Sequence, residues 1–396
     1  MTRTRAAISV TIGCLVAVVL SAQSATSPIL LVLSKADQTL AWVDPATLQV
    51  LAKTPSGPDP HEVVVSDDGK FAYISNYGGG IYNTLTVVDL TARKTLPAID
   101  LGPLYGPHGL DYAAGKLWFT AEANKVIGSY DPAAKRVDWV LGTGQNRTHM
   151  IHVSSDLKRM ITTNVSSATV TIIDRISVVG RGRPGAASGP PRTDWEETVV
   201  PVGRGAEGFD VLPDGREIWT ANAQDGTISI IDSAGKKVSA TLDANVRGAN
   251  RLKFTPDGKL VFVSTLGGTD VSIFNSATRR EVKRLKVGRG AAGIQMQPDG
   301  ARAFVSCTPD DYVVVVDLKS LEIVGHIEAG RQPDGLAWLA GRPAREARQP
   351  AMPAILAAVA PVMDCAQLAQ VDLSGLRDAP ARHTQSAAAF AWDARR

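Results

Sequence analysis

The sequence has 396 residues, of which 44% are hydrophobic and 20% charged, so a globular core can form. A chain of this length usually folds as two or three domains, unless it is built from repeats. The formal net charge of +3 is too small to predict nucleic acid or a strongly acidic surface as a partner.

The first 25 residues have the features of an export signal. A basic segment, MTRTR, precedes the apolar run AAISVTIGCLVAVVL, and SAQSA supplies small residues for cleavage. The run is short for a membrane-spanning helix. We therefore predict a signal peptide over residues 1–25, export to the bacterial periplasm or the medium, and no membrane span after cleavage. The mature chain retains only Cys307 and Cys365, so a disulfide framework is not expected.

One pattern recurs along residues 29–341: alternating β-forming residues, an apolar run, and a final Asp or Asn. The final residues are Asp44, Asp89, Asp131, Asp174, Asp232, Asn275 and Asp317. Successive copies are 42 to 45 residues apart, except for a step of 58 residues that ends at Asp232. In that step, VVGRGRPGAASGPPRTDWEE predicts an inserted flexible loop. Self-similarity at this period indicates a repeat fold.

Each copy contains four strand-like segments separated by turn signals. In the fifth copy the predicted strands are 207–212, 217–222, 227–232 and 237–242, joined at PDG, DG and AG sequences. Seven such copies predict an all-β fold, a seven-bladed β-propeller of four-stranded antiparallel blades. The first copy lacks its first strand, and an extra strand follows the last copy at 334–339. We therefore predict that the N- and C-terminal segments pair and close the ring.

The segment VGRGAEGFDVLPDGREIWTANAQDGTISIID resembles the YVTN-repeat, YncE-like family of bacterial seven-bladed propellers, and the resemblance covers residues 29–341. The resemblance implies the fold. It implies little about function, because related propellers include lactonases, lyases, cofactor-handling proteins and binding scaffolds. A role in the maturation of a redox cofactor or haem is implied by the resemblance alone.

Alignment of the copies places one residue of each blade at the start of the innermost strand, at one mouth of the central channel. This ring is His61, His108, His149, Glu207, Asn250, Ala292 and Asp334. Because the three histidines come from consecutive blades, we expect their imidazoles to converge. Three imidazoles and an open position suit Zn, Cu, Ni or Fe. The alternative is structural: each polar side chain caps a loop or bonds the backbone of a neighbouring blade.

Three further residues are predicted on the side of the histidines. Asp111 and His152 lie three residues further along the innermost strands, and Glu122 follows the second strand of the His108 blade. They are expected either to bind the metal or to orient its ligands. The predicted metal set is His61, His108, His149, His152, Asp111 and Glu122. Within it, His108 and His149 are also the candidates for proton transfer.

The other half of the mouth is predicted to hold an anion. Four consecutive blades carry an arginine three residues before the innermost strand: Arg204, Arg247, Arg289 and Arg331. A guanidinium group suits a carboxylate or a phosphate. The other predicted ligand-binding residues are Glu207, Asn250, Asp334 and Tyr105. The alternative is that each arginine pairs with an acidic side chain of the next blade.

Residues 342–396 are rich in Ala, Pro and Arg, and we expect them to be mostly disordered. Within them, MDCAQLAQVDLSGL weakly resembles the start of tannase and feruloyl-esterase chains. No esterase activity is predicted from it, because the long catalytic domain of those chains has no counterpart in this sequence.

Together these features predict an exported, monomeric propeller that binds a small anionic molecule at the channel mouth, with or without a divalent transition metal as its cofactor. One alternative is a metal-assisted lactonase or lyase, in which the metal polarises a carbonyl and a histidine moves a proton. Another is a scaffold for a second exported protein, with a ring that is purely structural.

Overall fold

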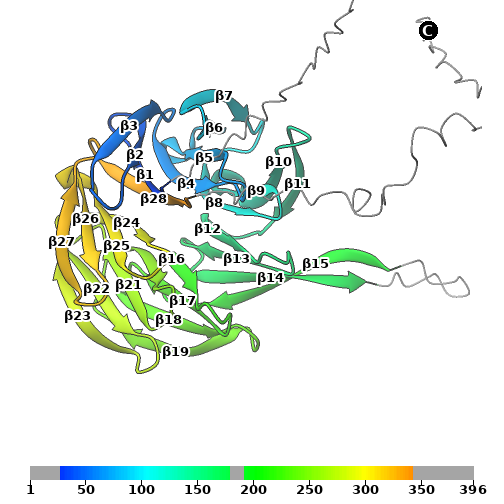
Figure 1. Ribbon diagram of the computed structural model, residues 1–396. Coiled ribbons are helices and arrows are strands. Elements are labelled where there is room, and N and C mark those ends of the chain that lie inside the picture. The colour runs from blue at the N-terminus through cyan, green and yellow to red at the C-terminus, as the bar shows by residue number, and fades with distance from the viewer. Residues whose placement is uncertain (1–26, 179–190, 342–396) are drawn as a thin grey trace, which may run out of the picture. The chain divides into compact units, whose positions relative to one another are not determined.

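The computed structural model describes residues 27–178 and 191–341, so the predicted signal peptide and C-terminal tail lie outside the described residues. Seven four-stranded antiparallel sheets are arranged in a ring, which confirms the predicted seven-bladed β-propeller (Figure 1). Over these two ranges, no helix is long and apolar enough to cross a membrane.

Blade 1 joins the two ends of the described chain. Its strands, from the channel outward, are β28 (Pro333–Leu339), β1 (Ile29–Ser34), β2 (Thr39–Val43) and β3 (Val50–Pro55). β1 and β28 pair antiparallel, with Ile29 opposite Leu339 and Leu31 opposite Ala337. The predicted closure of the ring is therefore confirmed, and β28 is the innermost strand that the first copy lacks.

The other six blades run in chain order from the channel outward. Blade 2 is β4 (Pro60–Val65), β5 (Phe71–Asn76), β6 (Thr84–Asp89) and β7 (Lys94–Asp100). Blade 3 is β8 (Pro107–Ala113), β9 (Lys116–Ala121), β10 (Val126–Asp131) and β11 (Arg136–Gly142). Blade 4 is β12 (Thr148–Val153), β13 (Arg159–Asn164), β14 (Thr169–Val178) and β15 (Arg192–Pro201).

Blade 5 is β16 (Ala206–Val211), β17 (Glu217–Asn222), β18 (Thr227–Asp232) and β19 (Lys237–Asp243). Blade 6 is β20 (Ala249–Phe254), β21 (Leu260–Thr265), β22 (Asp270–Asn275) and β23 (Arg280–Lys286). Blade 7 is β24 (Ala291–Met296), β25 (Arg302–Cys307), β26 (Tyr312–Asp317) and β27 (Glu322–Ile327). Three short 3₁₀ helices follow second strands: η1 (Gly78–Gly80), η2 (Glu122–Asn124) and η3 (Thr308–Asp310).

The acidic residue that ends most copies has a structural role. The Oδ1 atoms of Asp44, Asp89 and Asp131 each accept the backbone N–H two residues later, at 2.8 Å. This side-chain turn reverses the chain between the third and fourth strands. Asp174 differs, because its strand continues past it; its carboxylate pairs instead with Arg159 at 2.6 Å.

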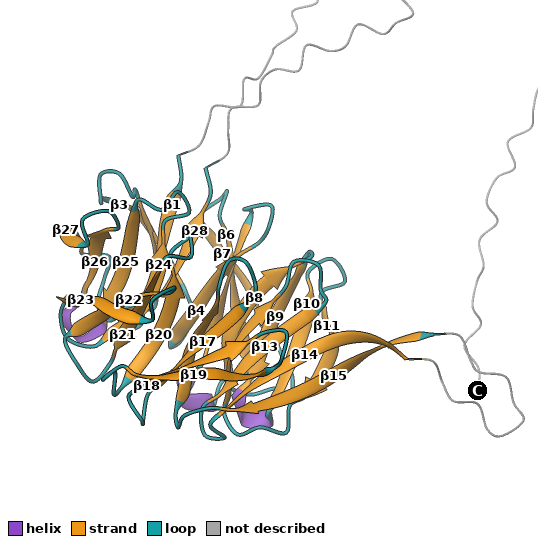
Figure 2. Ribbon diagram, turned by 90° about the horizontal axis from the view of Figure 1, so that it is seen from below, coloured by secondary structure: helices purple, strands orange, loops and turns teal. Residues whose placement is uncertain are grey.

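The insertion in blade 4 differs from its prediction as a flexible loop. β14 and β15 pair along all ten residues of each strand, from Thr169 opposite Pro201 to Val178 opposite Arg192. The loop prediction is therefore wrong for Val178 and for residues 192–197, and residues 179–190 lie outside the description. The ribbon projects beyond the neighbouring blades (Figures 1 and 2). Trp195 anchors its base by packing against Trp139 of blade 3, with ring centroids 5.6 Å apart.

The hydrophobic core lies between the facing sheets of adjacent blades. For example, Leu31 and Trp42 of blade 1 pack with Ile74 and Val88 of blade 2, and all four are buried. Such apolar contacts recur around the ring, in the way that stacked sheets bury their facing side chains. Cys307 is buried in this core as a free thiol.

Near the channel the innermost strands approach too closely for side chains at some positions. A Cβ atom added to Gly109 would lie 2.5 Å from the carbonyl oxygen of His149 on the next blade. Gly208, Gly293 and Gly335 meet the carbonyl of the next blade in the same way, at 2.4, 2.2 and 2.4 Å. This close approach brings neighbouring members of the mouth ring together.

Candidate binding site at the channel mouth

The three predicted histidines lie side by side at the mouth. The ring centroids of His108 and His149 are 3.8 Å apart, and those of His61 and His108 are 4.8 Å apart. Tyr77 packs edge-on against His108 at 4.9 Å. The backbone beneath is fixed across blades, because the Thr120 hydroxyl of blade 3 donates to the His149 carbonyl at 2.9 Å. We call His61, His108 and His149 the histidine row.

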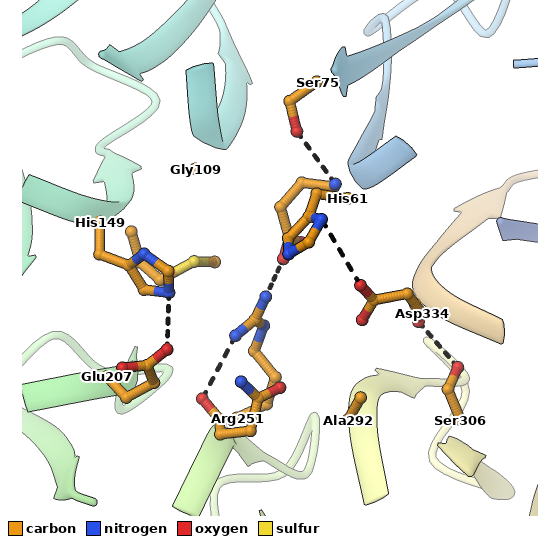
Figure 3. A network of polar contacts seen from close by, with 12 residues as sticks. His61, Ser75, Gly109, His149, Glu207, Arg251, Ala292, Ser306 and Asp334 are labelled. Carbon is orange, nitrogen blue, oxygen red and sulfur yellow. Dashed lines mark hydrogen bonds and ion pairs between the residues drawn. The ribbon is translucent and has the colours of Figure 1, made fainter. Parts of the chain in front are cut away.

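His149 is held between two carboxylates. Its Nδ1 contacts Glu122 Oε1, and its Nε2 lies 3.0 Å from Glu207 Oε1 (Figure 3). Burial alone would lower the pKa of His149, but Glu207 and Glu122 outweigh it and raise that pKa. Burial likewise opposes ionisation of Glu207, yet His149 and Arg147 lower the pKa of this carboxyl to about 2. His149 is therefore an imidazolium between two ionised glutamates.

Arg147 lies over this group and is 40% exposed, with its guanidinium 3.7 Å from Glu122 and 3.5 Å from Glu207. The Tyr77 hydroxyl donates to the second oxygen of Glu122 at 2.6 Å. Tyr77 and Glu122 both directly follow the second strand of their blades. The loop after that strand thus supplies the partners of the histidine row.

His108 differs from His149 in its charge, because its ring is neutral. Burial, followed by the charge of His149, lowers the pKa of His108 well below its usual value, so the ring is neutral. Its Nδ1 is buried and has no hydrogen-bond partner among the described residues. His149 Nε2 lacks an aligned hydrogen bond, but it lies 3.0 Å from Glu207 Oε1 and is therefore partnered by this carboxylate. His108 Nδ1 is thus the buried nitrogen of the row that has no polar partner among the described residues.

The other end of the row is built around Lys35, which the sequence analysis did not single out. Its ammonium donates to His61 Nδ1 at 2.8 Å and lies 3.3 Å from Asp334 and 3.4 Å from Asp59. Burial and then Lys35 lower the pKa of His61 to about 3, and burial raises the pKa of Asp334. Lys35 follows β1 just as Tyr77 follows β5, so alignment of the residue after each second strand would have found it.

Three of the four arginines of the other half are clamps within single blades. Arg204 Nε lies 2.7 Å from Asp225, and the same carboxylate accepts the Arg204 backbone N–H. Arg289 pairs with Asp310, and Arg331 with Asp37, in the same two-bond arrangement. Arg247 instead donates to the Gln224 carbonyl at 2.8 Å. The three aspartates belong to the arginine's own blade, whereas the structural alternative placed the acidic partner on the next blade.

The remaining predicted anion-binding residues occupy different positions. Asn250 and Asp334 are buried in the ring, whereas Tyr105 is 44% exposed at the rim beside η2. Asp111 and His152 do not join the histidine row. His152 Nδ1 lies 3.3 Å from Asp111, and Asp111 Oδ2 accepts the backbone N–H of Val153 at 2.7 Å. They lie in a cavity deeper in the channel.

Two further residues lie at the centre of the ring. Glu62 and Arg251, each one residue after a ring position, form an ion pair across the channel (Figure 3 shows Arg251). Their strands β4 and β20 belong to blades that are not neighbours. Arg251 is only 5% exposed. Both side chains also line the cavity in the deeper part of the channel.

The donor atoms of the histidine row do not fit a metal ion as they are arranged. His61 has both nitrogens within 3.3 Å of the Lys35 ammonium, and both nitrogens of His149 face carboxylates. The planes of the stacked His108 and His149 rings differ by only 34°, so their in-plane lone pairs do not converge on one point. Within the described ranges, no group of three or more His, Cys, Asp or Glu side chains is placed to hold a metal. The metal stays a prediction.

Comparisons with known proteins show the fold. No protein-family model matches this sequence, and no curated protein matches it. A protein of unknown function from Desulfotomaculum acetoxidans is 16% identical, with 79% of this chain and 99% of that chain covered and a TM-score of 0.62. A proposed 6-phosphogluconolactonase from Bacteroides fragilis is 15% identical, with coverages of 80% and 99% and a TM-score of 0.62.

A third similar structure is hydrazine synthase from Kuenenia stuttgartiensis, at 17% identity, coverages of 73% and 91%, and a TM-score of 0.59. At such identities the likeness establishes a shared architecture and leaves the chemistry open. The chain is thus a seven-bladed propeller similar to bacterial propeller proteins of several kinds.

Proposed function

We propose that this protein is an exported binding propeller that holds a small organic anion over the histidine row. The observation that carries the proposal is His108 Nδ1, a buried nitrogen that has no hydrogen-bond partner among the described residues and that lies beside the His149 imidazolium. A buried polar atom without a partner costs about 1–3 kcal/mol, so a ligand atom there gains what the protein itself leaves unmade. The neutral His108 ring can present Nδ1–H as a donor, and the nearby cations Lys35 and Arg147 favour an anionic oxygen as the ligand atom.

The surroundings favour an anion with an apolar body. Lys35 and Arg147 stand at the two ends of the row and are both cationic and partly exposed. On the rim, Ile81 and Tyr105 expose 70% and 44% of their surfaces. Carboxylate oxygens would therefore meet charged donors, and a short hydrocarbon chain would cover the apolar rim.

The test is calorimetric titration with acetate, butyrate, hexanoate and octanoate. We expect binding that tightens with chain length, and at least a tenfold loss of affinity in His108→Phe, which keeps the ring shape and removes the nitrogen. Arg147→Gln should weaken binding similarly, because it removes a charged donor. Arg247→Gln is the matched control, an exposed arginine on the same face that bonds only the Gln224 carbonyl. No binding of any of the four acids, or equal binding to His108→Phe, would refute the proposal.

A second candidate is the scaffold with a structural ring. It is supported by the mutual pairing of Lys35, His61, Glu122, Glu207 and Arg147, which satisfies most of the mouth internally. A scaffold predicts that none of the acids binds, and that mouth variants change only stability.

The enzymatic alternative keeps His108 and His149 as the proton-transfer candidates. Two similar structures, from Bacteroides fragilis and Bacteroides uniformis, are described as proposed 6-phosphogluconolactonases. Release of acid from 6-phosphogluconolactone above the spontaneous rate, lost in His108→Phe, would favour this alternative over simple binding.

A further inference from the structure

The channel also has a cavity on the far side of the ion pair of Glu62 and Arg251. A cavity of about 210 Å³ lies between the innermost strands, with this pair at its closed end. His152 and Asp210 line both this cavity and a groove of about 780 Å³. The groove is lined by turns after the innermost strands, including Ser154 and Gly215. Access is therefore from the face opposite to the histidine row.

Acidic and basic side chains alternate along one wall of this cavity. Four consecutive blades contribute Asp111, His152, Asp210 and Lys253 at equivalent positions. On the facing wall, blade 7 contributes the neutral Gln295. The cavity thus has two acids and two basic groups along one wall, and the rest of its lining includes the ion pair of Glu62 and Arg251 and the neutral Gln295.

The two acids are held in place by the backbone. Asp111 Oδ2 accepts the Val153 N–H at 2.7 Å, and Asp210 Oδ2 accepts the Phe254 N–H at 2.9 Å. In both cases the donor belongs to the next blade, so the carboxylates tie adjacent innermost strands together. A fixed carboxylate loses little conformational entropy when a ligand binds to it.

The two basic groups, in contrast, retain unused donors. Lys253 Nζ lies 3.7 Å from Asp210, too far for a hydrogen bond, and its side chain is 41% exposed. His152 approaches Asp111 through Nδ1 only, and its side chain is 45% exposed. Lys253 can therefore donate to a group that enters from the groove, and His152 presents Nε2 to the same group.

We propose that this cavity binds a small zwitterion of the α-amino-acid class. The ligand carboxylate would accept from Lys253 and His152, and its ammonium group would lie against Asp111 and Asp210. A plain anion or a plain cation would leave one half of the alternating wall without a partner. The volume limits the ligand to a compact molecule. The proposal is independent of the anion at the histidine row.

The experiment is calorimetric titration at pH 7 with L-alanine and L-serine, and with propionate and ethylamine as partial analogues. L-Alanine should bind at least tenfold more tightly than propionate, which lacks the amine, and than ethylamine, which lacks the carboxylate. Lys253→Met and Asp210→Asn should each weaken L-alanine at least tenfold. Asn retains an oxygen to accept the Phe254 N–H, so the fold is preserved.

The matched control is Lys259→Met, which removes an exposed lysine of the same blade that pairs with Asp257 away from the cavity. It should leave L-alanine binding unchanged, as should His108→Phe at the histidine row. The proposal is overturned if neither amino acid binds, if propionate or ethylamine binds as tightly as L-alanine, or if Lys253→Met binds like the wild type. If Asp210→Asn folds poorly, the two Lys253 variants decide, because the Lys253 side chain is 41% exposed and its replacement should not disturb the fold. L-Alanine should then bind more tightly to Lys253→Arg, which keeps the charge, than to Lys253→Met.

Discussion

The two ends of the channel are formed by the same seven innermost strands and both carry acids and bases, but the exposure of these side chains differs. At the histidine end, His108, His149 and Asp334 are buried and most charges are paired. At the opposite end, the side chains of His152 and Lys253 are almost half exposed. The loops after the second strands cover the first end with Lys35, Tyr77 and Glu122. Short turns at the second end leave its donors available.

Residue type alone therefore does not identify a ligand site on this propeller. Arginine occurs in two settings on this propeller. Arg289 is 68% exposed and clamps two loops of one blade, whereas Arg251 is buried and spans the channel. The same guanidinium chemistry thus has a local structural role in one place and spans the channel in the other.

The largest expected effect is on the buried pair. Arg251→Met leaves Glu62 charged and unpaired in the channel, and should lower the free energy of unfolding by about 3–5 kcal/mol. Adding Glu62→Gln should restore part of the loss. Urea denaturation measures both. Arg289→Met, the exposed counterpart, should cost less than about 1 kcal/mol. Equal losses in the two arginine variants would show that burial does not distinguish them.

The next effect is on acid stability. The folded pKa values of His61 and His108 lie below the usual 6.5, so the unfolded chain binds these protons first. The two histidines therefore contribute to the free energy of unfolding above pH 6.5. This contribution is lost as the pH falls from 6.5 to the folded pKa, which is about 3 for His61. Each histidine lowers the free energy of unfolding by up to about 1.4 kcal/mol for every unit by which the pH falls in this range.

Unfolding curves between pH 7 and pH 4 measure this slope, and His108→Phe should flatten it. His326, on outer strand β27, provides the control variant His326→Phe. His149 adds no slope below pH 6.5, since its raised pKa makes its contribution complete there; that contribution declines only as the pH rises above 6.5 towards and through the folded value. An unchanged slope in His108→Phe would mean that His108 is not neutral in the folded state.

The smallest expected effect is that of a chelator. Because His61 and His149 are already paired with Lys35 and glutamates, EDTA should leave the melting temperature unchanged within error. Elemental analysis of the purified protein checks the same point. Stoichiometric metal that is lost in a His61→Ala, His108→Ala, His149→Ala variant would instead place a metal at the histidine row.

Much of the fold could be predicted from the sequence, because it depends on local patterns. The Asp-terminated repeat and its DG turns marked the strands, and the extra segment at 334–339 pointed to the closure by β28. The hairpin of β14 and β15 was missed, because its Gly- and Pro-rich middle conceals the alternating residues on both sides. Trp195 stabilises that extension through contact with another blade, which no local pattern reveals.

For the site, the sequence determined which residues stand at equivalent points of the seven blades, since register follows from the repeat. It therefore placed His61, His108 and His149 in one ring. Tertiary structure decided their partners and charge states. Lys35 and Glu207 reach the row from blades 1 and 5, and Glu122 reaches His149 from the blade of His108. Arg251 meets Glu62 across 189 positions of sequence. Pairing and burial set these pKa values, and both depend on which side chains converge when the ring closes.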